Sequence, residues 1–135
     1  MAYDLSEPLV IGISSRALFN LEQENKIFEE QGLSEYEAYQ VQHEKDVLAK
    51  GSAFQLVRAF LNLNTRQEKR LVEVIVMSRN SPNTSLRIFN SIAHYGLDIT
   101  RAALTGGAEN APYLKAIRTD LFLSANQDDV KQAVD

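Results

Sequence analysis

The chain has 135 residues and no cysteine, 44% of its residues are hydrophobic and 24% are charged, and its formal net charge is -4. A chain of this length is long enough for one domain with its own core, and the lack of cysteine excludes disulfides and thiol catalysis. The negative charge argues against nucleic acid as a general partner, because phosphate backbones are bound through a surplus of basic residues. The N-terminal residues lack the pattern of a signal peptide, and no apolar run approaches the roughly 20 residues of a membrane span, so we expect a cytoplasmic protein with no membrane partner.

Four short apolar runs predict buried β-strands. Each run is rich in Val, Ile and Leu and is too short for a helix. The runs are residues 9–13, 71–77, 99–104 and 120–124. Because helical patterns lie between these strands, the sequence predicts a single α/β domain with a Rossmann-like, mostly parallel sheet.

The segment between residues 21 and 64 contains no strand pattern. We expect it to form a helical cap insert beside the strand ends, within the single domain that spans residues 1–135. Its three predicted helices cover about 22–31, 35–49 and 53–62. Two of these helices carry capping-box spacings, which are Ser34 with Glu37 and Ser52 with Gln55.

Two apolar patterns predict which helix faces are buried. The last helix of the insert should pack its apolar side chains, namely Phe54, Leu56, Val57, Phe60 and Leu61, on the sheet. A further helix after the second strand should bury Leu86, Phe89, Ile92 and Ala93, with Asn83 or Thr84 as its cap.

Three polar clusters directly follow predicted strands. They are "SSR" at 14–16, "SRNSPN" at 78–83 and "SANQDD" at 124–129. In open parallel sheets, ligands bind beyond the carboxyl ends of the strands. If the first strand is central, we expect the three clusters to converge on one site.

The residue types in the first two clusters suit a phosphate group. Ser78 can donate its hydroxyl to an anion, Arg79 can add a charge-assisted hydrogen bond, and Asn80 carries both donors and acceptors. Ser14, Ser15 and Arg16 can also bind phosphate, but no base accompanies the serines and no G-x-S-x-G pattern is present. An alternative interpretation of residues 78–83 is an ordinary strand-to-helix turn.

Lys115, Asp128 and Asp129 are further candidates with simpler alternatives. On residue type alone, Lys115 reads as an exposed helix lysine. Asp128 and Asp129 suit the first turn of a final helix better than a metal site.

Residues 10–44, 71–107 and 113–130 together resemble the N-terminal part of the cytosolic 5'-nucleotidase I family. That family dephosphorylates nucleoside monophosphates such as AMP or IMP and is related to the haloacid dehalogenase-like phosphatases, which use magnesium and an aspartyl-phosphate intermediate. The resemblance implies a haloacid dehalogenase-like fold. It also implies that Ser78 is the phosphate-binding hydroxyl, that Lys115 is a catalytic lysine, and that Asp128 and Asp129 lie near the acidic metal-binding motif.

The sequence also departs from the family pattern. Asn20 in "ALFN" stands where the family has the acid of "ALFD", and the family's aspartate motif, which resembles "DGDAVLF", is not found in the 135 residues. Covalent catalysis needs a nucleophile. We therefore expect the chain alone to hydrolyse nucleotides slowly at best.

Three functions remain open at this point. The first is a 5'-nucleotidase-family hydrolase that handles nucleoside monophosphates. The second is a non-catalytic nucleotide-binding or regulatory domain. The third is an interaction module, or a fragment, that pairs with a separate chain supplying the missing C-terminal half. For its partners we also consider a homo-oligomer.

Overall fold

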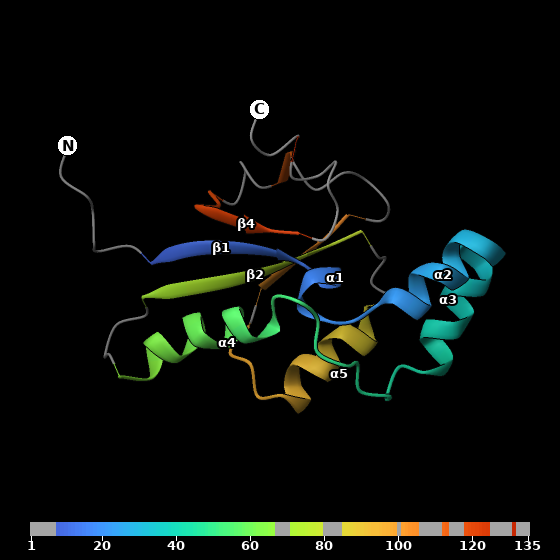
Figure 1. The fold of residues 1–135 in the computed structure, drawn as a ribbon, viewed down its shortest axis with the longest axis horizontal. Coiled ribbons are helices and arrows are strands. Elements are labelled where there is room, and N and C mark those ends of the chain that lie inside the picture. The colour runs from blue at the N-terminus through green and yellow to red at the C-terminus, as the bar shows by residue number, and fades with distance from the viewer. Residues whose placement is uncertain are drawn as a thin grey trace.

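The computed structural model describes residues 8–66, 71–79, 85–99, 101–105, 112–113, 118–124 and 131. Within these residues, four strands form one sheet in which every neighbouring pair is parallel (Figure 1). The strands are β1 (Leu9–Ser14), β2 (Val72–Ser78), β3 (Arg101–Leu104) and β4 (Leu121–Leu123), in the spatial order β3-β2-β1-β4. This arrangement confirms the predicted α/β fold with a Rossmann-like parallel sheet.

The two long strands occupy the centre of the sheet. Ile11 and Ile13 of β1 pair in register with Val74 and Val76 of β2, and all four side chains are at most 1% exposed. Continuous Val and Ile runs are typical of parallel strands that are covered on both faces. The first strand is therefore central, as the convergence of the polar clusters requires.

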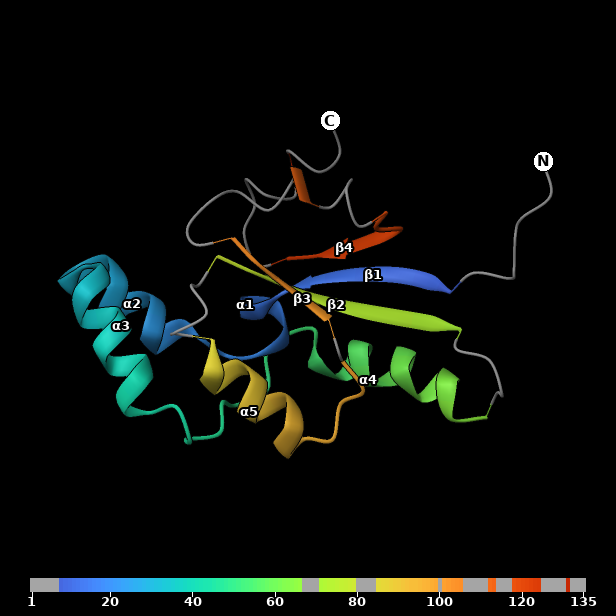
Figure 2. The ribbon, with the colours of Figure 1, turned by 180° about the vertical axis from the view of Figure 1, so that it is seen from behind.

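One face of the sheet carries most of the described core. Helices α1 (Ser15–Leu18), α4 (Phe54–Asn62) and α5 (Leu86–His94) contribute side chains to that core together with β1 and β2, and Figures 1 and 2 show α4 and α5 on the same side of the sheet. The opposite face has a smaller cluster, in which Ile75 and Met77 contact Val10, Ala103 and Phe122. No helix of the described residues is long and apolar enough to cross a membrane.

The buried faces of α4 and α5 differ in part from the predicted ones. In α4, Phe54, Val57 and Leu61 are buried as expected, but Leu56 is 46% exposed. In α5, the buried residues are Arg87, Ile88, Ser91 and Ile92, whereas Leu86 and Phe89 are 47% and 37% exposed. The α5 prediction was wrong by about one residue of rotation, because Arg87 and Ser91 have buried polar partners in the tertiary structure.

Helices α2 (Glu22–Gln31) and α3 (Leu33–Gln42) form a hairpin beyond the carboxyl ends of β1 and β2 (Figures 1 and 2). Gly32 joins them with a φ of 92°, a conformation that favours glycine. Because the chain reverses at Gly32, α3 begins at Leu33, and the predicted Ser34 capping box was wrong. The Ser52 box was also wrong, since Ala53 is the N-cap of α4 and makes no side-chain cap bond.

The predicted helix at 35–49 ends early, at Gln42. The backbone after it is bound by side chains of α5 instead of continuing its own helix: Asn90 donates to the Glu44 carbonyl, and Ser91 accepts from the Leu48 amide. These bonds to α5 explain why propensity alone placed the end of α3 too late.

A short helix that the sequence did not predict, α1, follows β1 directly. The Ser14 hydroxyl caps it by accepting a hydrogen bond from the Ala17 amide at 3.2 Å. Gly51 passes close to this helix, and a Cβ there would lie 2.5 Å from the Ala17 carbonyl oxygen. Glycine is therefore required at position 51 for close approach of the backbones.

Several predictions fall outside the described residues. The sequence also predicts a helix that begins near Pro112 and includes Tyr113. Pro112 and Tyr113 are helical, and residues 114–117 lie outside the described part. The same holds for the caps Asn83 and Thr84 and for the helix at Asp128 and Asp129.

Candidate phosphate-binding site

The carboxyl ends of the parallel strands share one edge of the sheet, which we call the carboxyl edge. Ser14 ends β1 and Ser78 ends the neighbouring β2, and Ser124 follows β4 on the other side of β1. The polar clusters after these strands therefore begin at the same edge, with β1 in the middle. Residues 125–129 of the third cluster lie outside the described part of the chain.

Two hydroxyl groups from different segments meet at this edge. Ser15 is the first residue of α1, and its Oγ donates to the Oγ of Ser78 at 3.5 Å. Both residues are buried, at 6% and 1% exposure. A serine hydroxyl can turn to donate or accept, so this pair can present a donor to an anion that enters from the carboxyl edge.

Ser14 has a structural role in the same region. Its hydroxyl accepts the Ala17 amide proton and so starts α1. That cap places Ser15 and Arg16 in the first turn of a helix immediately after the strand. The next residue, Ser15, contacts β2 through its hydroxyl.

Positive charge is supplied by Arg16 and Arg79. The Arg16 side chain is 37% exposed, and its Nη2 lies 3.9 Å from Oε1 of Glu22, whose side chain is 81% exposed. Exposed pairs at such distances interact weakly because water screens them. Arg79 follows β2 directly and is half-buried. The edge therefore carries one guanidinium group after each central strand.

Asn20 is exposed and begins the hairpin. Its Oδ1 accepts a hydrogen bond from the Glu22 amide at 3.1 Å, which satisfies one amide in the first turn of α2. Asn20 therefore makes a local turn bond just before α2, whose N-cap is Leu21, at the position where the resembled family carries an acid.

The described carboxyl edge does not fit a magnesium ion. Magnesium prefers carboxylate and water oxygens, whereas the described edge offers serine hydroxyls and guanidinium groups. No group of three or more His, Cys, Asp or Glu that could hold a metal occurs among the described residues. Asn80, Lys115, Asp128 and Asp129 lie outside those residues.

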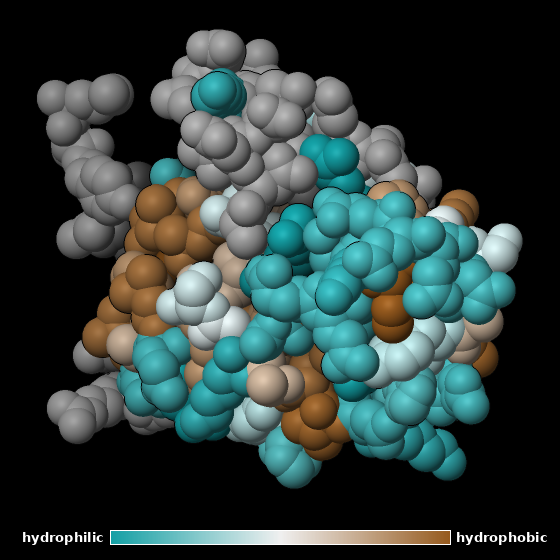
Figure 3. All heavy atoms as spheres, turned by 45° about the vertical axis from the view of Figure 1, so that its right-hand side comes forward, coloured by the Kyte–Doolittle hydropathy of each residue, from teal (hydrophilic) through white to brown (hydrophobic). Residues whose placement is uncertain are grey.

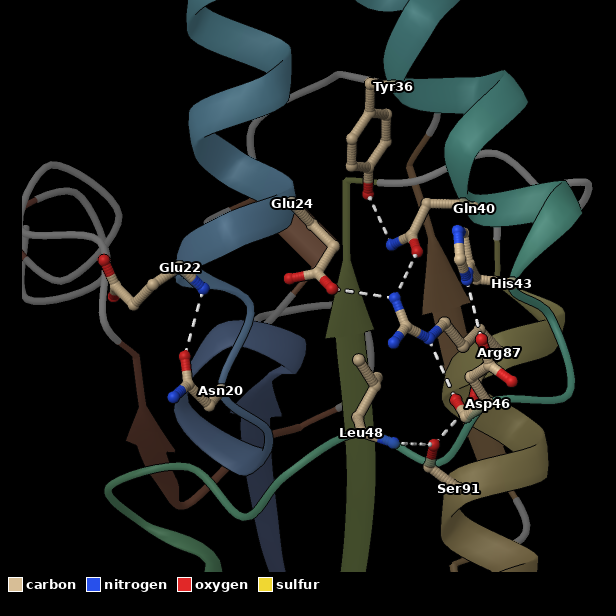
Figure 4. A network of polar contacts seen from close by, with 10 residues as sticks. All are labelled: Asn20, Glu22, Glu24, Tyr36, Gln40, His43, Asp46, Leu48, Arg87 and Ser91. Atoms are coloured by element: carbon tan, nitrogen blue, oxygen red, sulfur yellow. Dashed lines mark hydrogen bonds and ion pairs between the residues drawn. The ribbon is translucent and has the colours of Figure 1, made fainter.

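A second polar cluster, which the sequence did not predict, lies between the hairpin and α5 (Figure 4). Its buried members are Glu24, Gln40 and Arg87. Glu24 belongs to a run of glutamates that reads as a solvated helix face, so its burial has no local signal. No local signal marks Arg87 either, because the helical pattern predicted Leu86 and Phe89 on the buried face of α5.

The comparisons with known proteins agree with the resemblance. A family model described as 5'-nucleotidase matches residues 1–135. Cytosolic 5'-nucleotidase 1B of Homo sapiens is 38% identical to the chain over 132 residues, which cover 93% of this chain and 22% of that relative. The chain thus spans less than a quarter of the length of this curated relative, and no solved structure matches it. By its sequence, the chain belongs to the 5'-nucleotidase family.

Proposed function

We propose that the chain binds nucleoside monophosphates such as AMP or IMP through their phosphate group at the carboxyl edge. The observation that carries this proposal is the meeting of Ser15 and Ser78 at 3.5 Å, with one arginine after each central strand. Membership in the 5'-nucleotidase family supports the substrate class. The biological setting would be a cytoplasmic enzyme of nucleotide metabolism.

The physical basis is local positive charge in a chain whose formal net charge is -4. Arginine binds phosphate through charge-assisted hydrogen bonds in a fixed planar geometry. The weak contact between Arg16 and Glu22 leaves most of the Arg16 charge for an incoming anion. Asn80 would add a donor beside Arg79.

We propose further that the family reaction is a magnesium-dependent hydrolysis of the phosphate ester. In that reaction, Asp128 and Asp129 would hold the metal and Lys115 would contact the phosphate. The described edge supplies no carboxylate nucleophile at the end of β1, so for this chain alone we expect binding with slow hydrolysis at most.

The lack of a carboxylate nucleophile at the end of β1 favours a second candidate function. In this alternative the chain is a non-catalytic nucleotide-binding part of a larger assembly. The partner that supplies the nucleophile would be a C-terminal half, because a second copy of the chain lacks the same aspartate motif. Phosphate release from AMP with magnesium separates the candidates. Brisk release by the purified chain that Asp128→Asn abolishes would overturn the non-catalytic alternative.

Calorimetry with AMP, IMP and adenosine tests the phosphate site directly. Adenosine lacks the phosphate and should bind far more weakly than AMP. Arg79→Ala should weaken AMP binding by about 1.5–3 kcal/mol, or about tenfold or more, because it removes a charge-assisted bond.

Arg101→Ala is the matched control for that experiment. Arg101 is an exposed arginine at the start of β3, where it pairs with Glu73 rather than facing the carboxyl edge. Its loss should leave AMP affinity unchanged. Equal binding of AMP and adenosine, or equal losses in the two variants, would contradict the proposed site.

A further inference from the structure

The α2–α3 hairpin has no buried apolar residue of its own. Among the residues of α2, only Glu24 is buried, and among those of α3, only Gln40 is buried. Phe28 and Tyr36 contact each other edge to face at 5.9 Å, which holds the two helices together, but Phe28 is 47% exposed. Hydrophobic burial therefore does not explain how the hairpin is attached to the rest of the protein.

Among the described residues, one guanidinium group makes the buried polar contacts between α5 and the hairpin. Arg87 of α5 donates from Nη1 to Glu24 Oε1 at 2.7 Å and to Gln40 Oε1 at 3.1 Å (Figure 4). Its Nε donates to the Asp46 carbonyl oxygen at 2.9 Å. We call these contacts the Arg87 clamp. They join α5 to both hairpin helices and to the segment that follows them.

The side chains of the clamp are well shielded from water. Those of Arg87 and Glu24 are 9% and 6% exposed. Gln40 is fixed in turn by a bond of 3.4 Å from its amide to the Tyr36 hydroxyl. Because charge-assisted bonds are directional, a buried clamp of this kind specifies the orientation of the hairpin as well as its attachment.

The first turn of α2 connects the clamp to the carboxyl edge. Glu24 binds Arg87, and Glu22, two residues earlier, lies 3.9 Å from Arg16. The start of this turn is held by Asn20 through the Glu22 amide. A shift of α2 would therefore move the carboxylate that faces Arg16.

We propose that Arg87 is a positioning residue: it holds the α2–α3 hairpin at the carboxyl edge and, through the first turn of α2, sets the place of the Glu22 carboxylate that faces Arg16. The hairpin is then the capping part of the 21–64 insert, while α4 belongs to the layer under the sheet. The statement about Arg16 rests on the proposed function, whereas the statement about the hairpin does not.

Hydrogen exchange of the ligand-free 135-residue chain tests the hairpin statement. Arg87→Met should raise amide exchange in residues 22–42 by about tenfold or more, because the hairpin loses its buried anchor. Exchange in β1, β2 and α4 should change much less. Arg87→Lys should restore part of the protection, because a lysine keeps the charge for Glu24 without the planar fork.

Arg101→Met is the matched control, since it removes an exposed ion pair of 2.8 Å, close to the 2.7 Å of the pair between Arg87 and Glu24. It should leave the exchange of residues 22–42 unchanged. Glu24→Gln keeps the shape of the side chain and removes its charge, so it repeats the test if Arg87→Met folds poorly. Unchanged hairpin exchange in both clamp variants, or an equal rise in the hairpin and the sheet, would overturn the proposal.

Calorimetry with AMP tests the statement about Arg16. Arg87→Met should change AMP affinity by about twofold, because the exposed Glu22 carboxylate acts only weakly on Arg16, and Arg87→Lys should reverse part of the change. Unchanged AMP affinity in Arg87→Met would remove the link to Arg16. Absence of AMP binding in the wild-type chain would instead defeat the proposed function, and the exchange experiment would still decide whether Arg87 positions the hairpin.

Discussion

The sheet layer and the α2–α3 hairpin are held by different forces. In the sheet layer, Ile11, Val76 and Phe54 are fully buried and make one apolar core. In the hairpin, the buried residues are Glu24 and Gln40. Figure 3 shows the contrast at the surface, where hydrophilic residues cover most of the end formed by α2 and α3, and hydrophobic residues gather toward the strands and α4.

This difference separates stability from orientation. Apolar burial is strong but non-directional, so it gives the sheet layer most of the free energy of folding. Charge-assisted hydrogen bonds add less net free energy but fix geometry. The hairpin is therefore expected to unfold locally more readily than the sheet while having a defined position when it is folded.

The largest expected effect lies in the sheet layer. Phe54 is fully buried, with its ring centroid 4.9 Å from that of Tyr95. Phe54→Ala should lower the free energy of unfolding by about 3–5 kcal/mol in urea denaturation, because it leaves a cavity. Leu56→Ala, on the exposed side of the same helix, should change it by less than about 0.5 kcal/mol. Similar losses in the two variants would contradict the assigned core face.

Breaking the Arg87 clamp should lower the free energy of unfolding by less than a cavity in the apolar core does. Glu24→Leu leaves the Arg87 guanidinium without its carboxylate and should lower the free energy of unfolding by about 1–3 kcal/mol. The loss is limited because the hairpin can separate and let water reach Arg87.

A double variant sharpens that prediction. Glu24→Leu combined with Arg87→Met removes both charges, so it should be more stable than the sum of the two single losses implies. Urea denaturation of the four proteins measures this coupling. Strictly additive losses would show that the two side chains do not stabilise each other.

A smaller effect is expected where the hairpin begins. Asn20→Ala removes the oxygen that accepts the Glu22 amide proton and should lower the free energy of unfolding by about 0.5–1.5 kcal/mol. Asn20→Asp keeps an acceptor oxygen and should be close to wild type. Thermal unfolding of both variants makes the comparison, and equal losses would mean that the acceptor is not what matters at this position.

The smallest effect is expected at an exposed ion pair. Arg101 and Glu73 lie 2.8 Å apart, but their side chains are 52% and 20% exposed. Arg101→Ala should cost about 0.2–1 kcal/mol, and the cost should shrink in high salt. A loss as large as that of Glu24→Leu would show that burial does not account for the strength of the clamp.

The sequence predicted the parts of the fold that local pattern controls. The strands at β1 and β2 were found within one residue of their ends, and α2 was found with its bounds, because apolar runs and helix periodicity are local signals. The polar clusters after the strands were also visible, and parallel pairing brings Ser14 and Ser78 to one edge. The wrong predictions concern finer details, namely the caps of α3 and α4, the end of α3 and the buried face of α5.

The sequence by itself determined an α/β chain with phosphate-compatible residues at the strand ends and a recognisable family, whereas the sheet order of the structure placed the first strand at the centre. Only the tertiary structure decided how the hairpin is held. Arg87 contacts Glu24 across 63 positions of the chain and Gln40 across 47. The residues around each of these three positions in the sequence give no sign that the side chain is buried. Their burial becomes favourable only when folding brings their charges and hydrogen-bonding groups together, because a buried charge is stable only with its partner.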